Sequence, residues 1–245
     1  MLNAKLLSEF IDGFYGYGNL EAKLWFVGME EGGGTAEQEI EARLNSWNVR
    51  GGRLVEDVAE FHRSFGQPRW FEPKAPTQRT WRPMIQSILL AKDESCDIES
   101  IREYQINKFA RKGGEVASLE LMPLPSPSIR EDNWMYGDWS DLPYLTTRNS
   151  YLKAVVPARI KRFKALIEEH KPQAVVFYGA GYQRHWEAIS GCDFGSECLP
   201  RRAQKKSTAF LLLPHPTARP SGTPPTSGAD YFIAAGHVLK DLWNP

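Results

Sequence analysis

The sequence predicts an α/β protein: a three-layer α/β/α sandwich around a central, mostly parallel four-stranded sheet. Two observations predict it. Short apolar runs are typical of strands buried on both faces, and they lie at Leu24–Val27, Val116–Met122, Ala174–Tyr178 and Thr208–Leu213. Segments with helical periodicity separate these runs, as the crossovers between parallel strands require. The length of 245 residues, with 42% hydrophobic and 24% charged residues, suits an ordinary globular domain.

The helices are predicted from apolar residues at helical spacing. The first covers the N-terminal stretch from Leu2 to Phe14, where interspersed charges favour an amphipathic helix over a signal peptide or membrane span. The stretch from Thr35 to Lys112 lacks convincing strands and holds four helical candidates, at Ala36–Trp47, Leu54–Phe65, Pro83–Ala91 and Ile98–Arg111. Later helices are predicted at Tyr151–His170, Tyr182–Ile189 and Ala229–Trp243. We therefore expect a single domain over residues 1–245, with an enlarged helical insertion at about 35–112.

Charge and cysteine content exclude several classes of protein. Thirty basic and thirty acidic residues give no net charge, which counts mildly against nucleic acid as a partner. The three cysteines lack CxxC spacing, and the five histidines lack the spacing of metal ligands, so neither a disulfide scaffold nor an iron–sulfur cluster is expected. We expect a monomeric cytoplasmic protein without metal, metal cluster, cofactor or membrane partner.

The basic residues are unevenly distributed. The segment 199–229 contains no acidic residue, and its basic residues are Arg201, Arg202, Lys205, Lys206 and Arg219. A solvated basic loop would explain this pattern, and so would a phosphate-facing surface. The proximity of the segment to His215 favours the phosphate-facing surface.

Two predicted strands end in loops with chemically active side chains. Glu30 and Glu31 follow the first strand and precede three glycines, which allow a ligand to approach the backbone closely. The alternatives are a phosphate-binding turn or a flexible loop, but two carboxylates would repel a phosphate. We take Glu30 as the residue that acts and Glu31 as a structural one.

His215 follows the fourth strand and lies between two prolines. The prolines either fix the backbone and thereby the direction of the imidazole, or simply terminate the strand. Ligands of open parallel sheets bind at the carboxyl ends of strands, so Glu30 and His215 form a candidate catalytic pair. Glu120 lies within the apolar second strand, where an unpaired carboxylate is costly. It occupies either an edge position or a ligand-reading position.

Other motifs point away from common enzyme classes. The sequence Gly179-Ala180-Gly181 follows a strand but lacks the third glycine of a dinucleotide fingerprint. The chain contains no Walker A sequence and no GxSxG elbow, so the commonest nucleotide hydrolases and α/β-hydrolases are excluded. Aromatic residues at 134–144 form either a packed lid or a platform on which bases stack.

Taken together, these parts resemble the uracil-DNA glycosylase superfamily. The resemblance covers about half of the chain and rests on the order and spacing of four segments: Gly18-Asn19, Gly28-Met29-Glu30-Glu31-Gly32, Lys171–Val176 and Pro214-His215-Pro216-Thr217. It implies the three-layer fold and a monofunctional DNA glycosylase, which flips a base out of DNA and hydrolyses its N-glycosidic bond.

The resemblance also implies roles for individual residues. Glu30 would position water and stabilise the sugar cation, and His215 would donate a hydrogen bond to the departing base. Residues expected around the base are Glu120, Met29, Gly32 and Gly33. Residues expected to contact DNA are Arg201, Arg202, Lys205, Lys206, Thr217, Arg219 and Ser221. The family's wedge leucine is missing from the loop after His215, where Arg219 would take its place.

The departures from the family indicate a different base. Where the uracil-specific branch has a tyrosine that blocks substituents at C5 of the base, this chain has Gly32-Gly33-Gly34, which implies a roomy pocket. A carboxylate at Glu120 would accept a hydrogen bond from the N4 amino group of cytosine. The substrate expected is therefore a modified base such as a bulky 5-substituted cytosine, of a kind found in phage DNA, so the role would be repair or antiviral defence. Two alternatives are a catalytically silent DNA-binding module on the same scaffold and a hydrolase of small nucleosides.

Overall fold

The computed structural model describes residues 1–196, 199–219 and 227–242. Four parallel strands form the centre of its sheet in the order β4-β2-β5-β7. These strands are β2 (Leu24–Glu30), β4 (Val116–Met122), β5 (Ala174–Tyr178) and β7 (Thr208–Leu213). Their apolar side chains are almost entirely excluded from solvent, since each strand is covered on both faces. The α/β class and the positions of the four predicted strands are confirmed.

The predicted number of strands is wrong, because the described part of the chain forms a seven-stranded sheet, β3-β1-β4-β2-β5-β7-β6. The additional strands are β1 (Gly16–Gly18), β3 (Val55–Glu56) and β6 (Arg201–Lys205). All three are short and glycine-rich or polar, so they lack the apolar run that marks a buried strand. β1 pairs antiparallel with β4, and β6 pairs antiparallel with β7, so the sheet is mixed at its edges.

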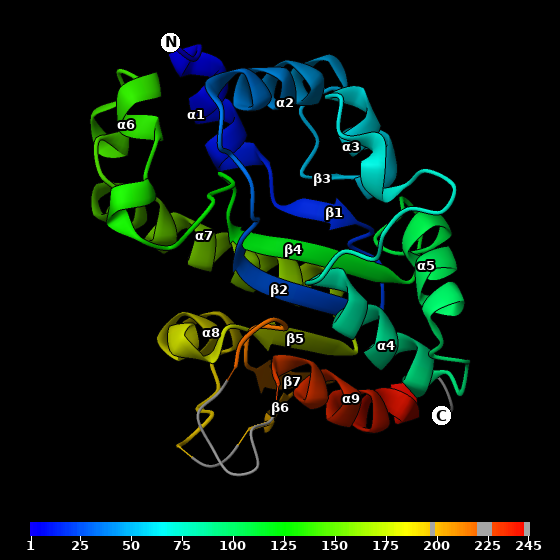
Figure 1. Cartoon of the computed structure of the whole chain (residues 1–245). Coiled ribbons are helices and arrows are strands. Elements are labelled where there is room, and N and C mark those ends of the chain that lie inside the picture. The colour runs from blue at the N-terminus through cyan, green and yellow to red at the C-terminus, as the bar shows by residue number, and fades with distance from the viewer. Residues whose placement is uncertain (197–198, 220–226, 243–245) are drawn as a thin grey trace.

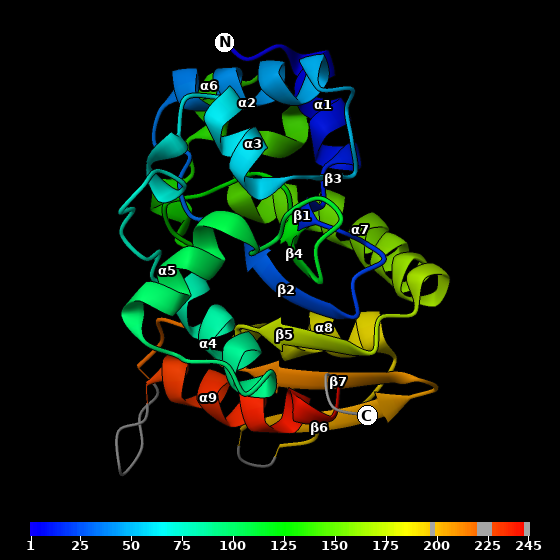
Figure 2. The same cartoon turned by 90° about the vertical axis from the view of Figure 1, so that its right-hand side faces the viewer.

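Helices lie on both faces of the sheet. In Figures 1 and 2, α4 (Trp81–Ala91) and α9 (Gly228–Leu239) lie on one face, and α7 (Arg148–His170) and α8 (Gln183–Ser190) lie on the other. The other α-helices in the described part of the chain are α1 (Ala4–Gly13), α2 (Glu37–Val49), α3 (Val58–Ser64), α5 (Ile98–Asn107) and the single turn α6 (Tyr136–Trp139). Among the described residues, no helix has both the length and the apolar character needed to cross a membrane.

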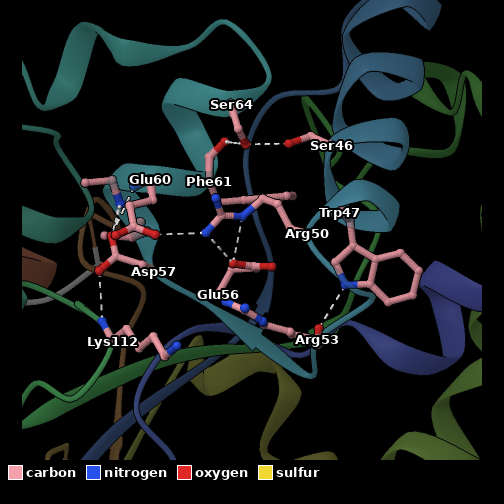
Figure 3. A network of polar contacts seen from close by, with 12 residues as sticks. Ser46, Trp47, Arg50, Arg53, Glu56, Asp57, Glu60, Phe61, Ser64 and Lys112 are labelled. Carbon is pink, nitrogen blue, oxygen red and sulfur yellow. Dashed lines mark hydrogen bonds and ion pairs between the residues drawn. The ribbon is translucent and has the colours of Figure 1, made fainter.

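The stretch 35–112 is mostly helical, and a polar network holds its first half together (Figure 3). Arg50, at the end of α2, donates to Glu56 of β3 at 2.9 Å and to Glu60 of α3 at 3.0 Å. Asp57 accepts the backbone N–H groups of Ala59 and Glu60, so it is the N-cap of α3. The helix predicted over Leu54–Phe65 therefore begins only after Asp57, and the residues before Asp57 pair with β1 instead.

Candidate functional site

A cavity of about 440 Å³ opens at the carboxyl ends of the central strands. Four of its lining residues come from or follow these strands, namely Glu30, Glu120, Tyr178 and His215. The glycine loop after β2 contributes Gly32 and Gly33, and the stretch 35–112 contributes a wall formed by His62, Arg69, Trp70, Gln78, Thr80 and Trp81. Because the strands are parallel and in register, segments distant in sequence converge here. Glu30 and His215, predicted as a pair from the sequence, line the same cavity.

Glu30, the last residue of β2, is held by an arginine from a different element. Nη2 of Arg148, the first residue of α7, lies 2.8 Å from Oε1 and 2.7 Å from Oε2 of Glu30. The two side chains are only 6% and 7% exposed. Burial raises the pKa of the Glu30 carboxyl above its ordinary value, and the positive charge of Arg148 opposes that rise. The carboxylate is therefore more basic than one in water.

Glu31 has a different environment from its neighbour. It accepts hydrogen bonds from the Tyr17 hydroxyl at 2.6 Å and from Nη1 of Arg43 at 2.8 Å, and Nε2 of His62 lies 3.4 Å away. Arg43 and His62 hold the pKa of Glu31 well below its usual range, although burial acts in the opposite direction. Glu31 is thus a permanently ionised group that joins β1, α2 and α3, which supports the structural role expected for it.

The third carboxyl group of the cavity, Glu120, lies beside Tyr178. The Tyr178 hydroxyl donates to Oε1 of Glu120 at 2.6 Å, whereas Oε2 is buried without a partner among the described residues. Burial raises the pKa of Glu120 to about 8. The group is thus mainly a neutral carboxylic acid at pH 7, not the carboxylate expected from the sequence. A methyl group at Gly28 would lie 2.2 Å from the Tyr178 oxygen and 2.4 Å from Oε2, so only glycine fits there.

His215 is exposed, and its ring lies against the edge of Tyr178 with centroids 5.8 Å apart. The backbone N–H of Thr217 donates to Nδ1 of His215 at 3.3 Å. Since an N–H group cannot accept, Nδ1 must be the acceptor, and a neutral His215 carries its proton on Nε2. Partial burial lowers the pKa of His215, which favours this neutral form. Nε2 is then left as a hydrogen-bond donor.

The structure separates the remaining residues that the sequence grouped at the site. Met29 is only 5% exposed in the interior of the sheet and does not line the cavity, because side chains of a strand alternate between its two faces. Thr217 contacts Nδ1 of His215 through both its hydroxyl and its backbone N–H, and Arg219 is exposed in the loop that follows. Ser221 lies outside the described residues.

The basic residues of β6 do not form one surface beside His215. Because β6 runs antiparallel to β7, Arg201 pairs with Leu212 near the carboxyl end of β7, and Lys205 pairs with Thr208 at its start. Arg201 and Arg202 therefore lie toward the end of the sheet that carries the cavity. Lys205 and Lys206 lie at the opposite end, so the expectation that they accompany His215 is wrong.

The residues of the site that were missed at the level of sequence include Arg148, His62 and Tyr178, each of which contacts one of the three carboxyl groups. Tyr178 is the last residue of β5, so the strand-end argument that found Glu30 and His215 would also have found it. Arg148 follows the N-cap Thr147 at the start of α7, where the helix dipole disfavours a cation. This unfavourable position is a signal that the arginine has an anionic partner. His62 had no comparable signal.

Replacing Glu120 by Gln tests its protonation state. Glu120 has a pKa of about 8 when folded, against 4.5 as its ordinary value. Its contribution to stability is therefore complete below pH 4.5 and is lost as the pH rises toward 8. E120Q retains a donor and an acceptor but cannot ionise. The free energy of unfolding of E120Q, relative to that of wild type, should therefore rise by a few kcal/mol between pH 5 and pH 8, since a shift of one pKa unit corresponds to about 1.4 kcal/mol. Urea unfolding at both pH values measures this, and a difference independent of pH would contradict it.

The comparisons with known proteins give no family. No protein-family model matches the chain, and no curated protein matches it either. Within the described residues, no group of three or more His, Cys, Asp or Glu side chains is arranged to hold a metal ion.

Proposed function

We propose that this protein is a DNA glycosylase, a divergent member of the uracil-DNA glycosylase superfamily that excises a modified base and leaves an abasic site. The observation that carries the proposal is the convergence of Glu30 and His215 on one cavity at the carboxyl ends of parallel strands. Helices on both faces of the sheet are compatible with the three-layer sandwich that this superfamily implies (Figure 2).

The reaction needs a group on each side of the bond that breaks. When the C1′–N bond breaks, its electron pair goes to the base and positive charge develops on the sugar. Glu30 would stabilise this cation and accept a proton from the water whose oxygen bonds to C1′. Its raised pKa suits that task, whereas the lowered pKa of Glu31 makes it a poor base. His215 would donate from Nε2 to the base as negative charge develops there.

The neutral carboxyl group of Glu120 suits one edge of a pyrimidine. A carboxylic acid offers one O–H donor and one acceptor, and cytosine presents an N4 amino donor beside its N3 acceptor. Glu120 would accept from N4 through Oε1, which also accepts from the Tyr178 hydroxyl, and would donate to N3 through Oε2. Gly32 and Gly33 line the cavity without side chains, which leaves space for a substituent at C5. A bulky 5-substituted cytosine is therefore the substrate that we propose.

DNA would approach the end of the sheet where the cavity opens. Arg201, Arg202 and Arg219 are the basic residues of the segment 199–229 that lie toward this end or in the loop after His215. Arg69, from the insertion, adds a cation to the cavity wall and stacks on Trp70 at 4.4 Å. These side chains are candidates for contacts with the phosphates that flank the flipped nucleotide.

A panel of duplexes, each with a different modified base, tests the function. Wild-type protein should release free base and leave alkali-labile sites in duplexes with 5-substituted cytosine, and should not hydrolyse the corresponding free nucleosides. Hydrolysis of free nucleosides alone would indicate a nucleoside hydrolase, and DNA binding without release of any base would indicate a catalytically silent module. Activity confined to uracil would contradict the argument from the open pocket.

A further inference from the structure

A second cavity, of about 520 Å³, lies at the opposite end of the sheet from Glu30 and His215. The C-terminal part of α7, the end of α8 and the turn between β6 and β7 surround it. Thr208, in its lining, is the first residue of β7, and Lys171 shortly precedes β5. These positions identify the amino end of the parallel strands, so a ligand bound here would not compete with one bound at the first cavity.

The floor of this cavity is apolar, and hydroxyl groups border it. Ile167, Ile189 and Phe210 line it and are at most 8% exposed. The hydroxyl residues Ser190, Ser207 and Thr208 also line it. A volume above about 300 Å³ with apolar walls and a few polar groups is typical of sites for small organic ligands. The floor therefore suits a flat ring with polar atoms at its edge.

The rim of the cavity is strongly cationic. Four lysines line it, Lys164, Lys171, Lys205 and Lys206, against a single acidic residue, Glu168. Lys205 donates to the carbonyl of Ser190 at 3.2 Å and so satisfies the C-terminal end of α8. The amino groups of the other three have no hydrogen bond or ion pair with any residue in the described part of the chain. Three unpaired ammonium groups around one apolar floor match a ligand with several negative charges.

We propose that this second cavity binds a free nucleoside polyphosphate, with the base against the floor of Ile167, Ile189 and Phe210 and the phosphates on Lys164, Lys171 and Lys206. A monocarboxylate would satisfy only one of the three ammonium groups. An inorganic polyphosphate would leave the apolar floor in contact with water. A nucleotide meets both requirements, and its site is independent of the proposed glycosylase activity.

Titration calorimetry of the full chain with ATP, adenosine and inorganic tripolyphosphate, in EDTA at low ionic strength, tests the proposal. ATP should bind at least about tenfold more tightly than either fragment, since only ATP engages both the floor and the rim. Added salt should weaken the binding, because the rim is exposed. No binding of ATP, or equal binding of ATP and tripolyphosphate, would overturn the proposal.

The double variant K164E/K171N should weaken ATP binding at least about tenfold. Asn is chosen at Lys171 because that residue has a left-handed backbone, with φ at 49°. The matched control K153E/K161N makes the same change of charge on exposed residues of α7 outside the cavity, and should bind ATP as wild type does. Equal loss in both variants would refute the site. Release of base from DNA, measured in parallel, should be the same in K164E/K171N as in wild type, so that failure of one proposal leaves the other intact.

Discussion

Replacement of Glu30 by Gln should lower the rate of base release about 10²–10⁴-fold, the usual contribution of a positioned general base. The substitution preserves the size of the side chain but removes both the negative charge and the proton acceptor that the proposed mechanism assigns to Glu30. DNA affinity should be unchanged, because Glu30 contributes no cation to phosphate binding. Single-turnover release of base from a modified duplex measures the rate, and fluorescence anisotropy measures the affinity.

The neighbouring glutamate provides a matched control. E31Q makes the same change one residue away, at a carboxylate held by Arg43 and Tyr17 rather than by Arg148. Folded E31Q should retain a rate within about tenfold of wild type, because its carboxylate is a poor base, although its unfolding midpoint should fall. If E31Q lost the chemical step and E30Q kept it, the roles of the two residues would have to be exchanged.

Replacement of Arg148 by Met should destabilise the protein by about 3–5 kcal/mol near pH 8, the range observed when one partner of a buried ion pair is removed. Arg148 is the only partner of the Glu30 carboxylate among the described residues, and both side chains are buried. Without Arg148, the folded-state pKa of Glu30 should rise further. The loss of stability in R148M should therefore be small below pH 4.5, where Glu30 is protonated in both proteins. It should grow as the pH rises above the folded-state pKa of Glu30 in wild type, because only the wild-type carboxylate has a cationic partner.

A double-mutant cycle separates this effect from lost packing. The variant E30Q/R148M removes both charges, so it should recover most of the stability that R148M loses. Urea unfolding of wild type, both single variants and the double variant at pH 5 and pH 8 gives the coupling free energy. A loss in R148M that is the same at both pH values, with no recovery in the double variant, would show that packing and not charge pairing is responsible.

The short-range pattern of apolar residues was sufficient to predict the four central strands of the sheet. The four apolar runs were recognisable because each central strand is buried on both faces, and the carboxyl ends of such strands meet. Glu30 and His215 could be found in this way. β6 could not, because the alternation of Arg201–Lys205 gives an edge strand without an apolar run, and its antiparallel direction depends on its partner. The same direction separates Lys205 and Lys206 from His215.

The partners of the carboxylates depend on long-range packing, which leaves little trace in the sequence. Arg148 lies far from Glu30 along the chain, and only tertiary structure brings the start of α7 to the end of β2. The protonation state of Glu120 also depends on burial beside Tyr178, which the residue type alone does not reveal. Met29 was misplaced because the resemblance aligned a motif without determining which face of β2 each side chain occupies.

The carboxylate of Glu31 attaches two helices of the stretch 35–112 to the loop after β2. Arg43 from α2 and His62 from α3 both bind it, and His62 also lines the cavity. A chain without these two helices would leave Glu31 with only the Tyr17 hydroxyl as a partner among the described side chains, and a partly buried carboxylate that has lost its cationic partners is strongly destabilising. The attachment of α2 and α3 to Glu31 therefore fixes the part of the cavity wall that contains His62. We expect changes in the size of the cavity to arise instead around Trp70 and Thr80, which follow these two helices in the sequence.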